Sequence, residues 1–366
     1  MKNYRRRAFA FLVVFSLFSF FDLVGNSVSQ RWDYLEAKIT ESTPPSERIE
    51  PLDEKNPQIE AAVAIQNRHI HELMAVPNVV GIATALSGRG AAILVLAKEA
   101  LQPGIIAESL EGLPVIVQPT GEISAMSGIP TSSSKSVSNT SPFPLPVPIG
   151  VSTGNIFQCE AGTIGARVKD AFGNVFALSN NHVFALENMA PIGSPILQPG
   201  LVDTSCGIIG NNLIGLLYKF VPINFGGGAN LVDAAIAYST TKVLGNSTPP
   251  EGYGTPNSVI LPPSIGQAVQ KYGRTTSLTT GVILAINANV LVTYGPSRSA
   301  EFSGQIVVSS PTSFILPGDS GSLLVTNNPS ANPVGLVFAG SGTGQFAIAN
   351  PIGPVLSAFA VTIDGR

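Results

Sequence analysis

The chain has 366 residues, of which 44% are hydrophobic and 12% are charged, and its formal net charge is −3. A chain of this length can bury a sizeable core and has room for two domains. Because no cluster of basic residues follows the first seven positions, the sequence lacks the electrostatic pattern of a nucleic-acid-binding protein.

The amino terminus has the pattern of an export signal. Basic residues within the first seven positions precede an apolar run over 8–21, and small side chains lie just before Gln30. We therefore predict a signal peptide over 1–29 and a secreted or periplasmic protein. A loose, charged and proline-containing segment is predicted over 30–57.

Asp22 ends the apolar run after about 14 residues, fewer than the roughly 20 that span a bilayer. The alternative is an uncleaved anchor that reaches through Gly25. Only in that case do we expect a membrane among the partners of the chain.

A small α/β module is predicted over 58–126. The apolar spacing over 57–74 is helical, short strand-like runs follow at 79–83, 91–96 and 113–117, and a further helix is expected around 106–111. His69 and His71 lie two positions apart on the predicted helix and so point in different directions, which argues against a shared metal ion. We predict no metal site and no cofactor.

Residues 127–148 are rich in Ser, Thr, Pro and Asn, a composition that buries too little apolar surface to fold, and we predict a linker there. The module before it is then a candidate pro-region that assists folding or holds the following domain in check. A substrate-binding or anchoring role for the module fits the sequence equally well.

The remainder, 149–366, has a β pattern throughout. Its short apolar runs are separated by Gly, Pro, Asn and Ser turns, which indicates a sandwich or a barrel. Cys159 and Cys206 are the two cysteines of the chain, and in an exported protein they predict one disulfide, with two free buried thiols as the alternative. A zinc site is disfavoured because two isolated cysteines lack the paired spacing of zinc ligands.

Three polar residues of this region carry the chemical signal. Ser320 lies between glycines in Gly-Asp-Ser-Gly-Ser (318–322), His182 follows an apolar run, and Asp233 enters a strand-like Ala/Ile run. We prefer Asp233 to its rival Asp203, because Asp203 lies in a loop that contains Pro, Gly, Ser and Cys. The order along the chain is His, Asp, Ser, which is the chymotrypsin order and differs from that of α/β-hydrolases and subtilisins.

With these motifs the chain resembles the chymotrypsin-like serine peptidases over about 150–360. It is most similar to a group of bacterial trypsin-like proteins that also resembles the plant narrow-leaf protein. The resemblance implies an all-β, chymotrypsin-like double β-barrel with its site between two six-stranded barrels. It also implies a secreted serine endopeptidase that acts on polypeptide substrates.

The resemblance assigns roles to these residues. His182 is the general base, Asp233 orients its imidazole, and Ser320 is the nucleophile that forms an acyl-enzyme. The backbone N–H groups of Gly318 and Ser320 are expected to form the oxyanion hole.

Further positions follow from the same resemblance. The Gly-Arg-Thr-Thr segment at 273–276 implies an ion pair between Arg274 and Asp319. The strand that contains Phe338 and Gly340 is expected to hydrogen-bond an extended substrate. Phe314, six positions before the serine, falls at the base of the specificity pocket, and this argues against trypsin-like selectivity because no carboxylate stands there.

Each of these residues also has an ordinary structural interpretation: a strand-end histidine, a loop-capping aspartate, a surface arginine and a turn serine. Two other functions therefore stay open. One is a non-catalytic module that holds peptides in the same crevice, and the other is a serine esterase or acyltransferase that uses the same triad.

Overall fold

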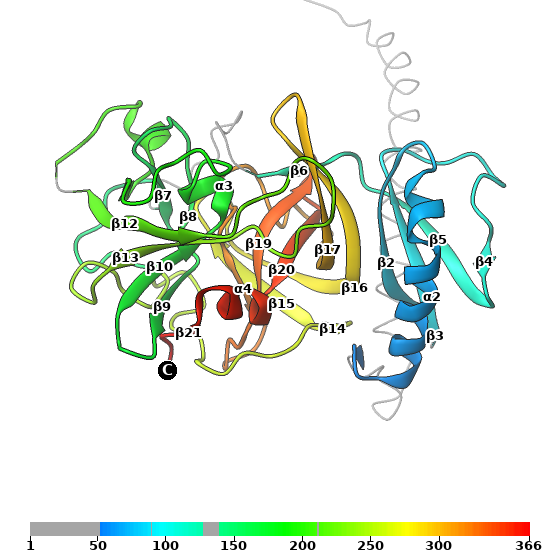
Figure 1. Cartoon of the computed structure of the whole chain (residues 1–366). Helices are drawn as coiled ribbons and strands as arrows, with labels where there is room; N and C mark the ends of the chain where they lie inside the picture. The colour runs from blue at the N-terminus through cyan, green and yellow to red at the C-terminus, as the bar shows by residue number, and fades with distance from the viewer. Residues whose placement is uncertain (1–51, 89, 127–138, 211) are drawn as a thin grey trace, which may run out of the picture. The chain divides into compact units, whose positions relative to one another are not determined.

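The computed structural model describes residues 52–88, 90–126, 139–210 and 212–366. The predicted signal peptide, most of the predicted loose segment and the first part of the predicted linker lie outside these ranges. Among the helices that they contain, none combines the length and apolar character needed to cross a membrane. Strands dominate the described chain (Figure 1).

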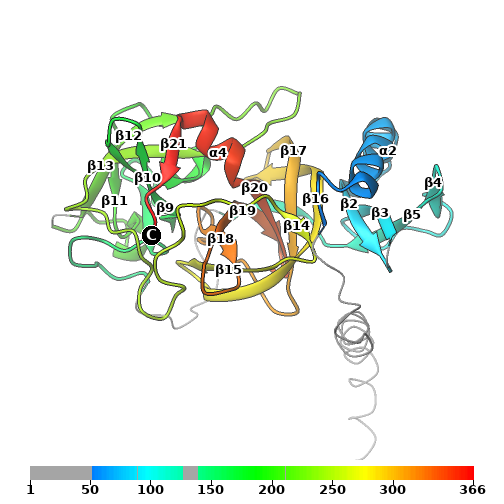
Figure 2. The same cartoon turned by 90° about the horizontal axis from the view of Figure 1, so that it is seen from below.

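The first barrel is a curled antiparallel sheet with the strand order β21-β9-β10-β13-β12-β11-β7-β8. Its strands are β7 (Ser152–Asn155), β8 (Gly162–Thr163), β9 (Ala166–Asp170), β10 (Val175–Ser179), β11 (Pro195–Leu197), β12 (Leu213–Phe220), β13 (Ala235–Ser239) and the carboxy-terminal β21 (Val361–Ile363). Side chains alternate across β10: Ala177 faces one apolar cluster, while Phe176 and Leu178 face another. The second cluster also holds Val355 of helix α4 (Ile352–Phe359), so this helix covers the outer face of the sheet (Figure 2).

The second barrel is closed, because its strands run in the order β15-β18-β19-β20-β17-β16 and β16 pairs again with β15. The strands are β15 (Ala268–Gly273), β16 (Ser277–Tyr294), β17 (Arg298–Ser309), β18 (Leu323–Thr326), β19 (Pro333–Ser341) and β20 (Phe346–Pro351). Fully buried Ile283, Ile306, Leu324 and Val337 belong to its core. The all-β, double-barrel class predicted for 149–366 is thus confirmed.

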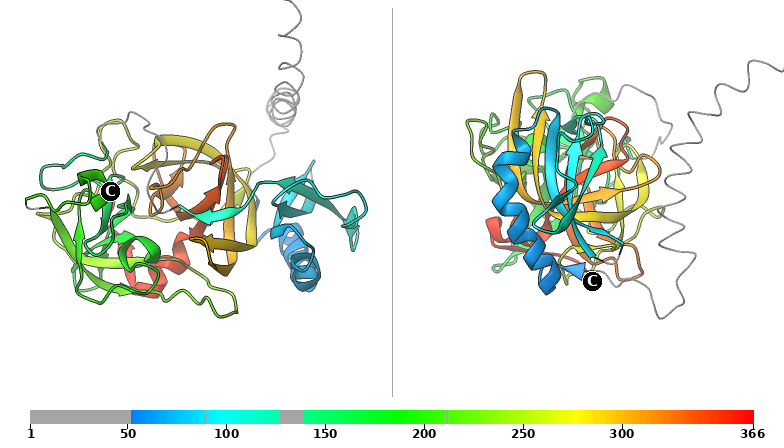
Figure 3. Two further views of the ribbon diagram at one scale, coloured as in Figure 1. Left: turned by 90° about the horizontal axis from the view of Figure 1, so that it is seen from above. Right: turned by 90° about the vertical axis from the view of Figure 1, so that its right-hand side faces the viewer.

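The amino-terminal module consists of helix α2 (Pro57–Met74) and the strands β2 (Val79–Ser87), β3 (Gly90–Ala97), β4 (Ser109–Leu110), β5 (Leu113–Pro119) and β6 (Ile123–Ala125). Helix α2 begins where Asn56 accepts a hydrogen bond from the Gln58 amide at 3.0 Å, with Pro57 in the first turn. Ile59, Ala62 and Leu73 form part of its buried face. Figure 3 shows α2 lying along the strands of the module.

The helix expected around 106–111 is absent, and this prediction is wrong. Ser109 and Leu110 instead form β4, which pairs with Pro114 and Leu113 of β5. Glu111, with a φ of 48°, and Gly112, with a φ of 87°, make the tight turn between the two strands. Left-handed backbone at two successive positions cannot continue a right-handed helix.

The module extends the sheet of the second barrel. Strand β2 pairs antiparallel with β16, with Ala85 opposite Ala285 and Gly81 opposite Val290. A Cβ atom at Gly81 would lie 2.8 Å from Val290 Cγ1, so only glycine allows this approach. Gln66 of α2 adds a hydrogen bond of 2.8 Å to the Asn287 carbonyl.

Part of the predicted linker is anchored to the barrels. Asn139 is buried and donates to the Gly273 carbonyl at 3.1 Å, and Tyr272 donates to Asn139 at 2.8 Å. Val147 is also buried, and its amide donates to Val243 at 2.8 Å. Residues 139–148 are therefore held by specific contacts that their polar composition did not predict.

Two strands outside the barrels, β1 (Leu52–Asp53) and β14 (Ser264–Ile265), pair antiparallel with each other.

The predicted disulfide between Cys159 and Cys206 is present, with the two Cα atoms 5.2 Å apart. It joins the turn after β7 to the end of the 3₁₀ helix η2 (Leu201–Thr204), where Cys206 directly follows the left-handed C-cap residue Ser205. The bridge closes a loop over a sequence separation of 47, inside which His182 lies.

We expect the Cys159→Ser/Cys206→Ser double variant to unfold more readily, because the open loop gives the unfolded chain more conformations. The chain-entropy relation puts the loss in the free energy of unfolding at about 4 kcal/mol. Urea titrations followed by fluorescence would measure it, with the reduced wild-type protein as a control that should match the variant. An unchanged midpoint would contradict a stabilising role for the bridge.

Candidate active site

The pairing of β10 with β13 brings His182 and Asp233 together. Ser179 at the end of β10 lies opposite Ala235 at the start of β13. The chain then turns into the short helix α3 (Asn181–Phe184), which carries His182, while Asp233 lies two positions before Ala235. The register therefore places both side chains at the same end of the first barrel.

The contact between the two side chains is direct and buried. His182 Nδ1 lies 2.5 Å from Asp233 Oδ2, and the His182 amide donates to Oδ1 at 3.2 Å. Neither side chain is exposed to solvent. Because Nδ1 faces the carboxylate, Nε2 is the nitrogen left for another partner, and it is buried without one among the described residues. Asp203, the rival acid, binds an arginine instead.

Tyr294 is a site residue that the sequence did not reveal. Its hydroxyl donates to Asp233 Oδ2 at 2.8 Å, and its ring meets the His182 ring edge to face at 5.9 Å. Burial, together with the negative charge of Asp233, raises the pKa of Tyr294 well above its usual value. The phenol therefore keeps its proton and acts as a donor to the carboxylate.

Two asparagines fix the backbone of Asp233. Asn180 Nδ2 donates to the Asp233 carbonyl at 2.7 Å, and the Asp233 amide donates to Asn350 Oδ1 at 2.9 Å. Both asparagines are buried. The Ser-Asn-Asn sequence before His182 thus has a structural purpose, because Asn180 reaches across to the segment that carries the acid.

Ser320 lies in the loop before β18, between two glycines with left-handed backbone. The φ angles are 100° at Gly318 and 93° at Gly321. A Cβ at Gly318 would come within 2.6 Å of Arg274 Nη1, and a Cβ at Gly321 would overlap Ser179 and Thr163 of the first barrel. Glycine is required at both positions because the loop presses against its surroundings.

The loops that carry the histidine and the serine converge on Gly162. A Cβ there would meet Val183 Cγ2 at 2.5 Å and the Ser320 carbonyl oxygen at 3.0 Å. The Ser320 carbonyl in turn accepts a hydrogen bond of 2.7 Å from the Thr163 amide. The first barrel therefore holds both loops at one place.

The hydroxyl of Ser320 does not bond to the imidazole in this structure. Its Oγ donates to the Phe338 carbonyl on β19 at 3.0 Å. Ser320 is fully buried, as is Phe338. The imidazole nitrogen Nε2 of His182 is thus without a partner among the described residues, and the Ser320 hydroxyl is bonded to a carbonyl of β19.

The predicted ion pair between Arg274 and Asp319 does not form, so this prediction is wrong. Arg274 binds Asp203 instead, with Nε donating to Oδ2 at 2.8 Å and Nη2 donating to Oδ1. The cation beside Asp319 is Lys271, whose Nζ lies 3.6 Å from Oδ2 with both side chains fully buried. Burial lowers the pKa of Lys271, and the charge of Asp319 partly opposes that shift.

The alternation of side chains along β15 explains why Lys271, and not Arg274, lies beside Asp319. Lys271 and Gly273 lie two positions apart and face the same side, and the Asp319 carboxylate lies directly against Gly273. Asp319 also accepts hydrogen bonds from the amides of Thr275 at 2.8 Å and Thr276 at 3.1 Å. Arg274 points the other way, toward the first barrel.

The amide of Gly318 already holds a peptide carbonyl. It donates to the carbonyl of Met126 at 2.7 Å, and the Met126 amide donates to the Phe338 carbonyl at 3.2 Å. Strand β6 of the module pairs antiparallel with β19, with Ser124 opposite Gly340. The strand expected to bind an extended substrate is paired here with a segment of the same chain.

Phe314 is fully buried in the apolar cluster that also contains Met126 and Ile315. Its ring lies 5.8 Å from Lys271 Nζ. No group of three or more His, Cys, Asp or Glu side chains that could hold a metal ion occurs in the described ranges.

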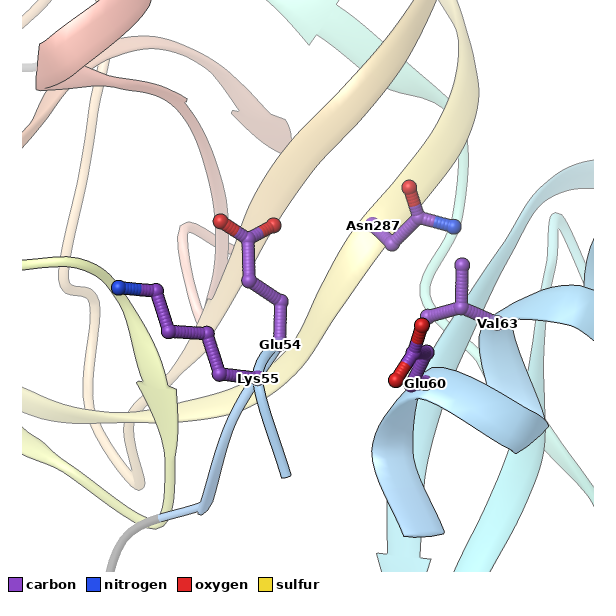
Figure 4. Close-up of a pocket in the computed structure, with 5 residues that line it drawn as sticks. All are labelled: Glu54, Lys55, Glu60, Val63 and Asn287. Carbon is purple, nitrogen blue, oxygen red and sulfur yellow. The ribbon is translucent and has the colours of Figure 1, made fainter. Parts of the chain in front are cut away.

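A separate, open pocket lies where the module meets β16 (Figure 4). Glu54, Lys55, Glu60, Val63 and Asn287 line it. Its charged groups come from the turn after β1 and from helix α2, and its lining includes neither His182 nor Ser320. We assign no function to it.

We expect Lys271 and Asp319 to be coupled in stability. Lys271→Met leaves the Asp319 carboxylate buried without its cation, which typically costs about 3 to 5 kcal/mol. In a double-mutant cycle measured by urea unfolding, Lys271→Met and Asp319→Asn should be clearly non-additive. Arg274→Met is the matched control, and its change in the free energy of unfolding should add to that of Asp319→Asn. Additive changes for Lys271 with non-additive changes for Arg274 would instead support the pairing predicted from the sequence.

No family model and no curated protein matches this sequence. Solved structures similar to it include a glutamic-acid-specific serine protease, with 21% identity over 59% of this chain and 100% of that one, and a TM-score of 0.43. Protease A of Thermobifida fusca has 17% identity over 56% of this chain and 92% of its own, with a TM-score of 0.40. A Nocardiopsis protease has 20% identity over the same shares, also with a TM-score of 0.40. All three are less than 25% identical to this chain and have TM-scores below 0.5.

Proposed function

We propose that this chain is an exported serine endopeptidase in which His182, Asp233 and Ser320 form the catalytic triad. The observation that carries the proposal is the solvent-free contact between His182 and Asp233, with Nε2 left for the serine. The Gly318 amide supports it, because it donates to a peptide carbonyl beside Ser320.

In the proposed mechanism, the Ser320 hydroxyl turns from the Phe338 carbonyl to His182 Nε2, a rotation about its own Cα–Cβ bond. Nε2 accepts the proton while Oγ attacks the substrate carbonyl, and the imidazolium then returns the proton to the leaving amine. Asp233 stabilises the imidazolium and fixes its tautomer through Nδ1. Tyr294 donates to the same carboxylate oxygen that His182 Nδ1 contacts and acts as a positioning residue.

The oxyanion of the tetrahedral intermediate would be bound by the backbone amides of Gly318 and Ser320. Donors that are fixed before the reaction stabilise developing charge without reorganising, and the loss of one donor typically costs about 10² to 10³-fold in rate. The left-handed backbone at Gly318 supports this role, since it turns the amide toward the acyl group.

Export is part of the proposal. The disulfide between Cys159 and Cys206 supports an oxidising compartment, where such bridges persist. The signal-like pattern over 1–29 points the same way.

A peptide-binding module without catalysis is the second candidate. The hydrogen bond from Ser320 to the Phe338 carbonyl favours it, because a hydroxyl held there is not activated. The triad and the binding module differ in whether Ser320 can react at all, and a covalent probe decides between them.

We expect a fluorophosphonate probe to label the full-length protein at Ser320. Residues 123–126 occupy the groove, so the probe reacts only when they leave it, and the irreversible label accumulates with time. Labelling should vanish in Ser320→Ala and His182→Ala, and Asp233→Asn should slow it on the order of 10⁴-fold by upsetting the imidazole tautomer. Mass mapping of the labelled peptide and circular dichroism of each variant complete the test. Absence of label on a folded chain that lacks residues 1–126 as well as on the full-length protein would establish the binding module instead.

We expect Tyr294→Phe to lower kcat/KM for a peptide substrate by about 10- to 100-fold, the equivalent of one hydrogen bond to a charged group. The loss should appear in kcat and leave KM nearly unchanged, because the phenol acts on Asp233 and not on the substrate. Tyr238→Phe, at an exposed position of the first barrel, is the matched control. Equal activities of the two variants would remove Tyr294 from the mechanism.

A further inference from the structure

Residues 123–126 lie on β19 as an extended substrate would. The register pairs Ile123 with Ser341, Ser124 with Gly340 and Ala125 with Ala339. Figure 3 shows this end of the module reaching the strands of the second barrel. The hydrogen bonds of Met126, from its amide to Phe338 and from Gly318 to its carbonyl, complete the ladder at the serine.

The geometry at Met126 is that of the residue whose carbonyl is attacked. The Phe338 carbonyl accepts from both the Met126 amide and the Ser320 hydroxyl, at 3.2 Å and 3.0 Å. The serine oxygen and the Met126 backbone are therefore bound to the same atom. On the far side of the residue, the proposed oxyanion donor already holds the carbonyl oxygen.

The side chain of Met126 fills an apolar pocket. Met126 is 4% exposed and belongs to the same cluster as Phe314 and Ile315. A Cβ at Gly340 would lie 3.1 Å from Met126 Cε and 2.6 Å from Ile315 Cγ2, so the absence of a side chain at Gly340 makes room for the end of the methionine. An unbranched apolar chain of this length fits the space.

This pocket offers no free counter-charge to a charged side chain. Lys271 lies behind Phe314, but it is bound to Asp319 and donates to Thr276 and to the Ser277 carbonyl. A carboxylate in the pocket would lack a free cation, and an ammonium would lack an anion. Burying either charge unpaired is costly.

We propose that the site prefers methionine and similarly sized unbranched or γ-branched apolar residues on the acyl side of the bond that it cuts, and that the bond after Met126 in this same chain is its first substrate. This inference rests on the proposed function. The module over 58–126 then ends at the residue that the site recognises.

The reaction conserves atoms and charge. Ser320 Oγ bonds to the Met126 carbonyl carbon and gives its proton to His182 Nε2; the bond from that carbon to the nitrogen of residue 127 breaks, and the imidazolium protonates the departing amine. Water then attacks the Met126 ester, again with His182 as base. The products are the Met126 carboxylate, a free amino group on residue 127 and the regenerated Ser320 hydroxyl.

The first test follows the full-length protein by mass spectrometry and amino-terminal sequencing. Wild type and Met126→Leu should yield a new amino terminus at residue 127 at rates within about tenfold of each other, since methionine and leucine are similar in volume and such swaps in an apolar site cost little. Met126→Asp should slow this cleavage at least about 100-fold, because it would bury a carboxylate. Ile105→Asp, at an exposed apolar position of the same module, is the matched control and should behave as wild type.

The second test uses reporter peptides Ile-Ser-Ala-X with a chromogenic amide leaving group, which repeat the sequence of residues 123–125 before the varied position. Methionine and leucine at X should react at least about 100-fold faster than glutamate or lysine. Gly340→Ala should shift the preference toward alanine at X, a change of selectivity that a purely structural role for Gly340 would not produce. Fluorophosphonate labelling of each variant shows that its serine is still reactive.

The outcomes separate the two proposals. If Ser320 takes up no label and no reporter is cut, the proposed function itself has failed. If Ser320 is labelled but the new amino terminus lies elsewhere, if Met126→Asp is processed as fast as wild type, or if a charged reporter is preferred, the peptidase stands and the assignment of Met126 is overturned.

Discussion

The site depends on a contact between two backbones that leaves no room for a side chain. Gly321, after the serine, lies against Ser179 and Thr163, and a Cβ at Gly165 would overlap the Gly321 carbonyl. Because backbone positions are stiffer than side chains, this approach fixes the serine loop of one barrel against the strands of the other. The glycines around Ser320 are therefore as much a requirement of barrel packing as of the reacting loop.

Around that contact, the polar groups of the site are buried but paired. Asp233 receives the His182 ring and the Tyr294 hydroxyl, while Asp319 receives two backbone amides and the Lys271 cation. Each carboxylate has its donors arranged by strands that are distant in sequence. Two atoms of the described site lack a partner, Asn180 Oδ1 and His182 Nε2, and the second is the ring nitrogen that the proposed mechanism uses as proton acceptor.

The candidate residues His182, Asp233 and Ser320 and the double barrel could be predicted from the sequence, because one histidine in the β region, a strand-entering aspartate and a serine flanked by glycines are local signals. The sequence did not allow their supporting groups to be predicted. Tyr294 meets Asp233, and Lys271 replaces Arg274 beside Asp319, through registers and pleats that join residues 40 or more positions apart. The position of Met126 beside Ser320 could not be predicted for the same reason. It follows from the pairing of β6 with β19, and the local sequence does not encode that pairing.

Strand β2 has a consequence for the protein after cleavage. It covers the edge of β16 over Ala285–Val290, so any release of the module would uncover a row of unpaired amide and carbonyl groups there. An open sheet margin of this kind invites pairing with a second polypeptide. If the module stays bound after cleavage, β2 would thus protect the barrel from self-association, whether or not β6 still occupies β19.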